Sequence, residues 1–264
     1  MGDWRSYDAV ADVYGRVHAP RFAEAARDLV GELLVGADDR VLDVGAGTGV
    51  GASAAAESGA RAVGIDRSVP MLSTGLRGRP ELRLLAAEVV DLPFRDASFD
   101  VVIGNFVLAH FAKVDTALFD IVRVLRPGGR VGFTSWADGD DAFQEAWLEL
   151  VERVVPREML EPAYGAAAPG HDRYKHPDAV EEVLRDAGFR HIRAQRRRYR
   201  WTYPREELVE GFGTWAVGRF VHQMLGEDGW SSLMERAQAT FADRFPDPLN
   251  DFRDVILAVG SVPD

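Results

Sequence analysis

Short apolar segments alternate with helical segments along residues 40–136, and this alternation constrains the fold more than any other feature of the chain. Apolar runs typical of buried strands occupy residues 40–44, 62–65, 82–86, 99–103 and 130–135. Helical patterns lie between them at 48–58, 68–76 and 115–125. Strands that alternate with helices pair in parallel and are covered by helices on both faces. The pattern therefore predicts a doubly wound α/β sheet.

The rest of the chain is predicted to add helices and two more strands. Helical patterns cover residues 7–17 and 20–35, before the first strand. After residue 136 we expect helices, a long loop and alternating strand patterns. In chain order these are a helix over 142–155, a loop over 156–176, a helix over 177–187 ended by Gly188, a strand over 190–201, two helical stretches within 205–242 and a strand over 252–259.

Composition excludes several kinds of chemistry. The chain has no cysteine, which excludes a catalytic thiol, a disulfide framework and a cysteine-based zinc site. Its net charge of −11 disfavours binding to phosphate backbones, because these require a positive field. No paired-histidine or His-x-Glu spacing indicates a metal site. No secretory signal is visible, and the longest uncharged apolar-rich stretch, residues 101–112, is too short to span a bilayer.

A glycine-rich loop follows the first predicted strand, in the segment Val41-Leu42-Asp43-Val44-Gly45-Ala46-Gly47-Thr48-Gly49. Such glycines let a ligand approach the backbone, although the same pattern also occurs in plain tight turns. A dinucleotide fingerprint requires Gly or Ala where this chain has Val50, so the spacing favours a nucleoside cofactor without a pyrophosphate. Asp66, which ends the second strand, can accept both hydroxyls of a ribose or can cap the next helix beside Ser68.

Five ordered motifs carry a resemblance to a known family: Asp43–Gly49, Asp66, Leu92-Pro93-Phe94, Asn105-Phe106-Val107-Leu108 with His110, and Leu125-Arg126-Pro127-Gly128-Gly129. From about residue 7 to residue 136 the chain resembles the class I S-adenosylmethionine-dependent methyltransferases of small-molecule type, the group related to ubiquinone- and menaquinone-biosynthesis enzymes. The resemblance implies a seven-stranded Rossmann-like sheet with an antiparallel last strand. It also implies one domain, residues 1–264, with a helical cap at 1–37, a cofactor-binding core at 38–136 and a substrate-side half at 137–264 that has a helical insertion at about 204–246.

The resemblance implies that S-adenosylmethionine binds where the first two strands end. The loop backbone would pass beneath the methionine part at three glycines, Gly45, Gly47 and Gly49. Asp43 would help to hold the ammonium group of the cofactor. Asp66 would bind the ribose hydroxyls with Arg67 beside it, and Met71 would contact the adenine.

Further cofactor contacts are implied along the next two strands and at the N-terminus. Glu88, where the family usually has Asp, would accept from the adenine amino group, and the Val89 amide would donate to a ring nitrogen. Asn105 and Phe106 would border the methionine part and the transferred methyl. Two tyrosines of the first helix either fold over the cofactor, as in the family, or are ordinary core residues: Tyr7 and Tyr14.

The acceptor side is less defined, because methyl transfer needs mainly alignment and desolvation, and needs a base only when the nucleophile must lose a proton. His110 is the best candidate base, although a histidine that packs in the following helix explains the position at least as well. Weaker candidates are His18, His171, Asp138, Asp140 and Asp141. The substrate residues that we expect are His18, Trp136, Phe212 and Trp215. They would lie beneath a lid made by the N-terminal helices, the loop at 156–176 and a helix at 206–225, unless the aromatics are ordinary core.

Six arginines crowd the strand predicted at 190–201: Arg190, Arg193, Arg196, Arg197, Arg198 and Arg200. They could bind an anionic substrate or a nucleic acid, or they could be the charged edge of a sheet, where charge prevents pairing with other strands. The acidic net charge and the place of this strand in the family's fold favour the charged edge.

Four function classes follow from these features. They are a small-molecule methyltransferase acting on O, N or C, a macromolecule methyltransferase, a non-methylating enzyme that keeps the cofactor, and a nicotinamide oxidoreductase, which Val50 disfavours.

All but two of the 31 basic residues are arginine, which is typical of a GC-rich bacterial gene. We expect a cytoplasmic bacterial methyltransferase, monomeric or homodimeric, with a small-molecule acceptor and without a metal, a nucleic-acid partner or a membrane span.

Overall fold

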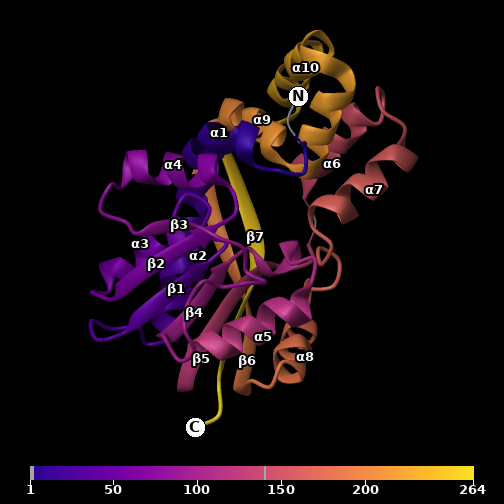
Figure 1. Ribbon diagram of the computed structural model, residues 1–264. Helices are drawn as coiled ribbons and strands as arrows, with labels where there is room; N and C mark the ends of the chain where they lie inside the picture. Colours follow the sequence, from indigo (N-terminus) through magenta and orange to yellow (C-terminus); the bar gives the residue numbers. More distant parts are fainter. Residues whose placement is uncertain (1–2, 140) are drawn as a thin grey trace.

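A seven-stranded sheet with the order β3-β2-β1-β4-β5-β7-β6 forms the centre of the molecule (Figure 1). The computed structural model describes residues 3–139 and 141–264. Strand β7 is antiparallel to both of its neighbours, and the other adjacent pairs are parallel, as predicted. The strands are β1 Arg40–Val44, β2 Arg61–Asp66, β3 Leu84–Ala86, β4 Phe99–Asn105, β5 Leu125–Trp136, β6 Arg190–Tyr203 and β7 Leu249–Ser261.

Helices cover both faces of the sheet, which confirms the doubly wound arrangement. Those around the sheet are α1 Ala11–Val17, α2 Ala19–Glu32, α3 Val50–Glu57, α4 Val69–Gly78, α5 Val114–Val124 and α8 Pro177–Asp186. Apolar side chains of α2 and α3 pack on one face, with Val41, Val101 and Ile103 of the strands. Those of α5 and α8 pack on the other, with Phe133 and Ile256. Burial of a strand on both faces explains why these strands appear in the sequence as short continuous apolar runs.

Local signals set several element ends. Ser68 caps α4 as expected, since its hydroxyl accepts from the Met71 amide. Gly188, with a φ of +95°, ends α8. The first predicted helix differs slightly, because it begins as a short 3-10 turn, η1 Asp8–Val10, before α1.

A second apolar core lies beyond the carboxyl ends of the parallel strands, where four helices gather (Figure 1). They are α6 Ala142–Val151, α7 Arg157–Ala167, α9 Arg205–Gly211 and α10 Ala216–Arg244, with a 3-10 turn, η3 Phe212–Thr214, between the last two. Helix α7 corrects the loop predicted for residues 156–176. Leu160 and Ala163, both 2 % exposed, place one face of α7 against its neighbours, and this packing outweighs the local effect of Pro162.

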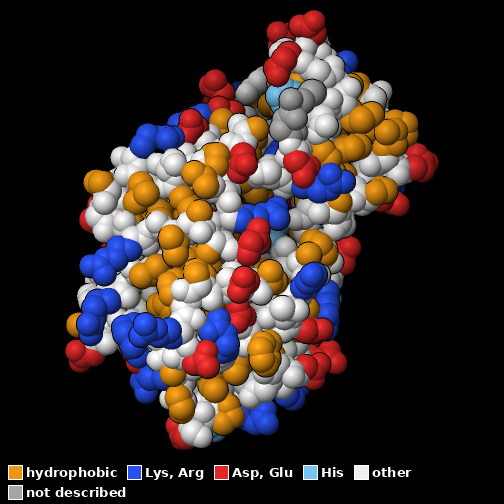
Figure 2. Space-filling view, in the orientation of Figure 1, with side chains coloured by type: hydrophobic (Ala, Val, Ile, Leu, Met, Phe, Trp, Pro, Cys, Tyr) orange, Lys and Arg blue, Asp and Glu red, His pale blue; other side chains and the backbone are white. Residues whose placement is uncertain are grey.

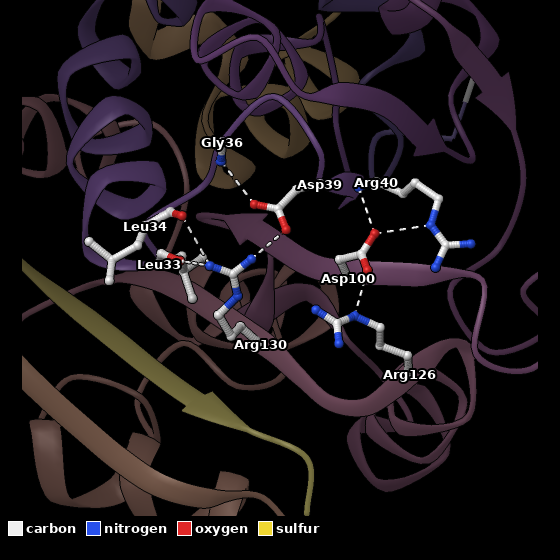
Figure 3. Close-up of polar contacts among 8 residues, drawn as sticks. All are labelled: Leu33, Leu34, Gly36, Asp39, Arg40, Asp100, Arg126 and Arg130. Carbon is white, nitrogen blue, oxygen red and sulfur yellow. Dashed lines mark hydrogen bonds and ion pairs between the residues drawn. The ribbon is translucent and has the colours of Figure 1, made fainter. Parts of the chain in front are cut away.

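Two acid-centred networks tie strands together at the amino ends of β1 and β4 (Figure 3). The Asp100 carboxylate accepts from the Arg40 amide and side chain and pairs with Arg126. The Asp39 carboxylate accepts from the Gly36 amide and pairs with Arg130. These contacts hold the end of the sheet that lies opposite the second core.

The arginine-rich strand β6 lies at the sheet edge, as predicted. Its arginines pair with acids of neighbouring elements: Arg197 with Asp28 and Glu32 of α2, and Arg198 with Asp254 of β7. Figure 2 likewise shows acidic and basic side chains interspersed over the face in view. Within the described residues, no helix combines the length and apolar character that a membrane crossing requires.

Candidate active site

The glycine loop after β1 makes a tight backbone cradle. Gly45, Gly47 and Gly49 all have positive φ, at +65°, +55° and +81°. A Cβ added at Gly45 would lie 2.2 Å from Cγ2 of Val107, so the space and the backbone conformation both require glycine there. The loop is therefore built for close approach to the backbone, which a plain tight turn does not require.

Asp43 stabilises this loop from below and does not line a cavity. Its carboxylate is 1 % exposed and accepts from the Ala52 amide at 2.7 Å, in the first turn of α3. Burial raises the pKa of Asp43 to about 7. A Cβ at Gly51 would lie 2.7 Å from the carboxylate, so glycine is required beside it.

Asp66 links the end of β2 to the glycine loop. Its carboxylate accepts from the Gly47 amide and from the Ser68 amide, each at 2.8 Å. Burial raises the pKa of Asp66, although the two amide hydrogen bonds oppose that shift. Each carboxylate oxygen keeps a free lone pair, so the side chain can still accept hydrogen bonds from a ligand.

A cavity of about 320 Å³ lies above the loop. It brings together most of the predicted cofactor residues: Tyr7, Tyr14, Gly45, Gly47, Asp66, Arg67, Met71, Glu88, Val89, Asn105 and Phe106. Gly49 is outside the lining, because it precedes α3 and packs beside Leu82. Lining residues that the sequence interpretation missed include Arg5, Phe111, Lys113 and Ala167, which belong to no recognisable motif.

Phe106 has a strained backbone at the end of β4. Its φ is +58°, a region that bulky residues rarely adopt. The Phe106 amide donates to the Thr134 hydroxyl at 2.8 Å, and that hydroxyl donates to the Asn105 side-chain oxygen at 2.7 Å. These bonds to β5 hold the strained turn, and such strain is characteristic of functional sites.

A larger cavity of about 900 Å³ adjoins the first. Four residues line both: Tyr7, Tyr14, Phe106 and His110. Three of the four predicted substrate residues line the larger cavity, namely His18, Trp136 and Trp215. Phe212 does not, because it is fully buried in the second core, where it stacks on Trp147 at 4.8 Å. Arg21, Phe22 and Trp201 also line this cavity, and no sequence motif marks Arg21 or Phe22 as site residues.

His110 has a fixed tautomer at the junction of the two cavities. Its Nδ1 lies 3.0 Å from the Ala167 carbonyl oxygen, which can only accept, so Nδ1 carries the proton. Nε2 is left with a lone pair. Burial lowers the pKa of His110, which keeps the ring neutral at pH 7.

The weaker base candidates within the described residues line the larger cavity and not the smaller one. The His18 Nε2 lies 3.3 Å from the Gly211 carbonyl, and burial lowers the pKa of this ring to about 3. His171, Asp138 and Asp141 line the larger cavity, while Asp140 is outside the described residues. Among the described residues, histidines and acids do not gather in groups of three or more that could hold a metal.

The N-terminal segment closes over both cavities and is held by α10. The Arg219 side chain donates to the Trp4 carbonyl at 2.7 Å and lies over the Tyr7 ring at 4.1 Å. Tyr7 in turn packs edge-on against Tyr14, with ring centroids 5.5 Å apart. The tyrosines are thus cavity walls and not only core residues.

Comparison with known proteins agrees with this geometry. A family described as "Methyltransferase domain" matches residues 42–133. Demethylmenaquinone methyltransferase of Renibacterium salmoninarum is 31 % identical over 189 residues, which cover 69 % of this chain and 78 % of that protein. The Beutenbergia cavernae protein of the same name is 36 % identical over 182 residues, covering 69 % and 72 %.

A solved structure shares the fold. Haemonchus contortus phosphoethanolamine N-methyltransferase 2, in complex with phosphomonomethylethanolamine and S-adenosylhomocysteine, superposes with a TM-score of 0.62 at 18 % identity. The match covers 100 % of this chain and 61 % of that one. With the sequence relatives, the fold and the glycine loop, this places the chain in the class I S-adenosylmethionine-dependent methyltransferases.

Proposed function

We propose that this enzyme methylates a small molecule bound in the larger cavity, at the junction where Tyr7, Tyr14, Phe106 and His110 meet. One observation carries the proposal: these four residues line both cavities, so the two spaces meet at a single, largely aromatic boundary. A cofactor on one side and an acceptor on the other would face each other there. Alignment of this kind is the main contribution a protein makes to an in-line displacement.

The residues around the smaller cavity fit S-adenosylmethionine. The positive-φ glycines leave backbone accessible, Asp66 has free lone pairs for hydroxyl donors, and Met71 supplies an apolar surface. Glu88 and Val89 line the same cavity and would bind the adenine. When bound, S-adenosylmethionine supplies an electrophilic methyl group on a sulfonium.

His110 would orient the acceptor and accept its proton. The Ala167 carbonyl fixes the proton on Nδ1, so Nε2 is available to a hydroxyl or amine of the acceptor. The aromatic walls would exclude water from the junction, which strengthens polar contacts inside it. An acceptor that is already deprotonated would not need this base.

The relatives' name makes demethylmenaquinone one candidate acceptor. The alternative class is a non-methylating enzyme that keeps the cofactor. Incubation with S-adenosylmethionine and 1,4-dihydroxynaphthalene, a soluble bicyclic hydroquinone, distinguishes these two classes. Methylated product with equimolar S-adenosylhomocysteine supports methyl transfer, whereas altered substrate without S-adenosylhomocysteine supports the second class.

Calorimetric titration tests the cofactor site directly. We expect saturable binding of S-adenosylmethionine and S-adenosylhomocysteine and no binding of NAD. Binding of NAD without either sulfur compound would overturn the proposal.

A pH profile tests the role of His110. Because the pKa of His110 lies below the usual imidazole value of about 6.5, its Nε2 should lose the lone pair only in acid. Methyl transfer to 1,4-dihydroxynaphthalene should therefore fall in kcat/KM only at acidic pH, below the usual imidazole range. The His110→Gln variant should be slower by about 10²–10⁴-fold and should lack this acid limb. An unchanged acid limb in the variant would assign the titration to another group.

A further inference from the structure

Arg21 is a cation in the wall of the larger cavity that has no polar partner for its side chain. It lies in the first turn of α2. Within residues 3–139 and 141–264, its guanidinium makes neither a hydrogen bond nor an ion pair, and Nη2 is buried without a partner. Two other arginines of the same wall are paired, Arg198 with Asp254 and Arg253 with Asp251. Arg21 is therefore the exception among the arginines of this cavity.

Aromatic and backbone contacts hold Arg21 in place, and no carboxylate of the described residues bonds to its guanidinium directly. Its guanidinium carbon lies 3.6 Å from the centroid of the Tyr203 ring. The Tyr203 hydroxyl is already donated to Asp251, at 2.7 Å, and Asp251 also accepts from Arg253. The Trp201 indole donates to the Arg21 carbonyl at 2.8 Å, which fixes the backbone. Burial lowers the pKa of Arg21, as expected for a cation removed from water.

The acids of the same cavity do not compete for Arg21. Asp254 pairs with Arg198 and Arg196, while Arg253 pairs with both Asp141 and Asp251. The lining acid without an ion pair in the described chain is Glu145, an exposed residue of α6. Arg253 is shared by two carboxylates, and none of the described lining acids forms a direct ion pair with Arg21.

A planar surface accompanies this cation. Phe22 stands next to Arg21 and packs against Phe106, with ring centroids 4.9 Å apart, and against Trp136 at 5.7 Å. His18 lies one turn before Arg21 on the same side of the chain. Its Nε2 is used by the Gly211 carbonyl, which leaves Nδ1 as an acceptor. Arg21 would thus offer a donor to an anionic oxygen group and Phe22 a surface to a flat ring, while the His18 Nδ1 could accept only from a donor group.

We propose that the acceptor carries a carboxylate that binds the guanidinium of Arg21, with its planar body against Phe22 and Trp136. This inference rests on the proposed function only in taking the larger cavity as the acceptor site. An arginine matches a carboxylate with two parallel hydrogen bonds, which a neutral group cannot reproduce. Arg21 would then favour such an acceptor over neutral ones of similar shape, demethylmenaquinone included.

Binding of two matched probes to the full chain tests the assignment without turnover. 2-Naphthoate and 2-naphthamide share a ring system and differ in charge, and their binding can be followed by quenching of tryptophan fluorescence. We expect naphthoate to bind at least tenfold more tightly than naphthamide.

Arg21→Gln should remove that preference and Arg21→Lys should keep part of it. The matched control is Arg198→Gln, which removes a paired, largely exposed arginine of the same cavity and should leave the preference intact. Equal affinities in the wild type, or a preference that survives Arg21→Gln, would overturn the proposal.

Thermal unfolding separates a binding role from a structural one. Arg21→Met should leave the midpoint unchanged or raise it, because an unpaired half-buried cation is lost. Arg253→Met should lower it, because Asp141 and Asp251 would lose their partner. Naphthoate should raise the midpoint of the wild type and not that of Arg21→Met. A drop for Arg21→Met as large as that for Arg253→Met would show that Arg21 is structural. Titration with S-adenosylmethionine is a separate measurement, so failure of the proposed function would be recognised independently.

Discussion

The two cavities are built by different means, although they share a boundary. The smaller one includes two positive-φ glycines, Gly45 and Gly47, and further residues within a few positions of the ends of β1, β2 and β4. The larger one is lined by side chains from three separate stretches of chain, residues 7–22, 106–175 and 198–254. A site made of backbone requires particular residue types at fixed spacing, whereas a site made of helix faces accepts many sequences. Cofactor binding and acceptor choice should therefore respond differently to substitution.

The largest expected effect is a loss of folding stability when the second core is disrupted, which should differ from the effect of changing the adjoining cavity wall. Phe212→Ala should cost about 3–5 kcal/mol in the free energy of unfolding, because a fully buried aromatic is removed from a packed core. Trp215→Ala, which changes a cavity wall, should cost less and should instead weaken acceptor binding. Urea unfolding and steady-state kinetics with 1,4-dihydroxynaphthalene measure the two effects. If both variants lost stability and S-adenosylmethionine affinity to the same extent, the assignment of Phe212 to the core and of Trp215 to the cavity wall would be contradicted.

A smaller effect is expected at the glycine loop. Gly45→Ala introduces a Cβ at a φ of +65° and 2.2 Å from Val107, which should cost about 2 kcal/mol in strain. If the strain is relieved by moving the loop, S-adenosylmethionine should bind about 30-fold more weakly, by calorimetry. The control is Gly139→Ala, because a Cβ there meets nothing within 4 Å. Similar losses of S-adenosylmethionine affinity in both variants would show that the glycine loop has no particular need for glycine at position 45.

The smallest expected effect is a change in how stability depends on pH. His18 is neutral in the folded chain down to about pH 3, while an unfolded chain takes up the proton near pH 6.5. Between these values the unfolded state binds more protons, so stability decreases as pH falls, by up to about 1.4 kcal/mol per pH unit. His18→Gln should lessen this slope in urea unfolding between pH 7 and pH 5, whereas His176→Gln, at an exposed site, should leave it unchanged. An identical slope in His18→Gln and the wild type would argue against a neutral buried ring.

The sequence predicts the sheet well, and the reason is physical. Strands buried on both faces leave continuous apolar runs, and the ladder between β6 and β7 places the arginine-rich strand at an edge, as its composition indicates. The cofactor loop is equally recognisable, because positive φ at Gly45 and Gly47 allows few alternatives.

The missed features depend on contacts between distant segments. Helix α7 was predicted as a loop because its prolines and glycines are visible in the sequence, whereas the neighbours of Leu160 are not. Phe212 and Trp215 fall within the same helix predicted at 206–225, yet only the fold decides which one is buried in the core and which one lines the cavity. The sequence does not mark Arg21 as a site residue, because an arginine in the first turn of a helix is usually solvated. Whether its side chain has a polar partner depends on residues that the fold brings near it.

The hydrogen bond between Arg219 and the Trp4 carbonyl joins residues 215 positions apart. During synthesis, the glycine loop and its strands leave the ribosome long before α10 does. The wall formed by Tyr7 gains its contact with Arg219 only once α10 has emerged, so a nascent chain that ends before α10 would contain the whole glycine loop and still lack this support for the cofactor cavity. The completion of the site thus waits for α10.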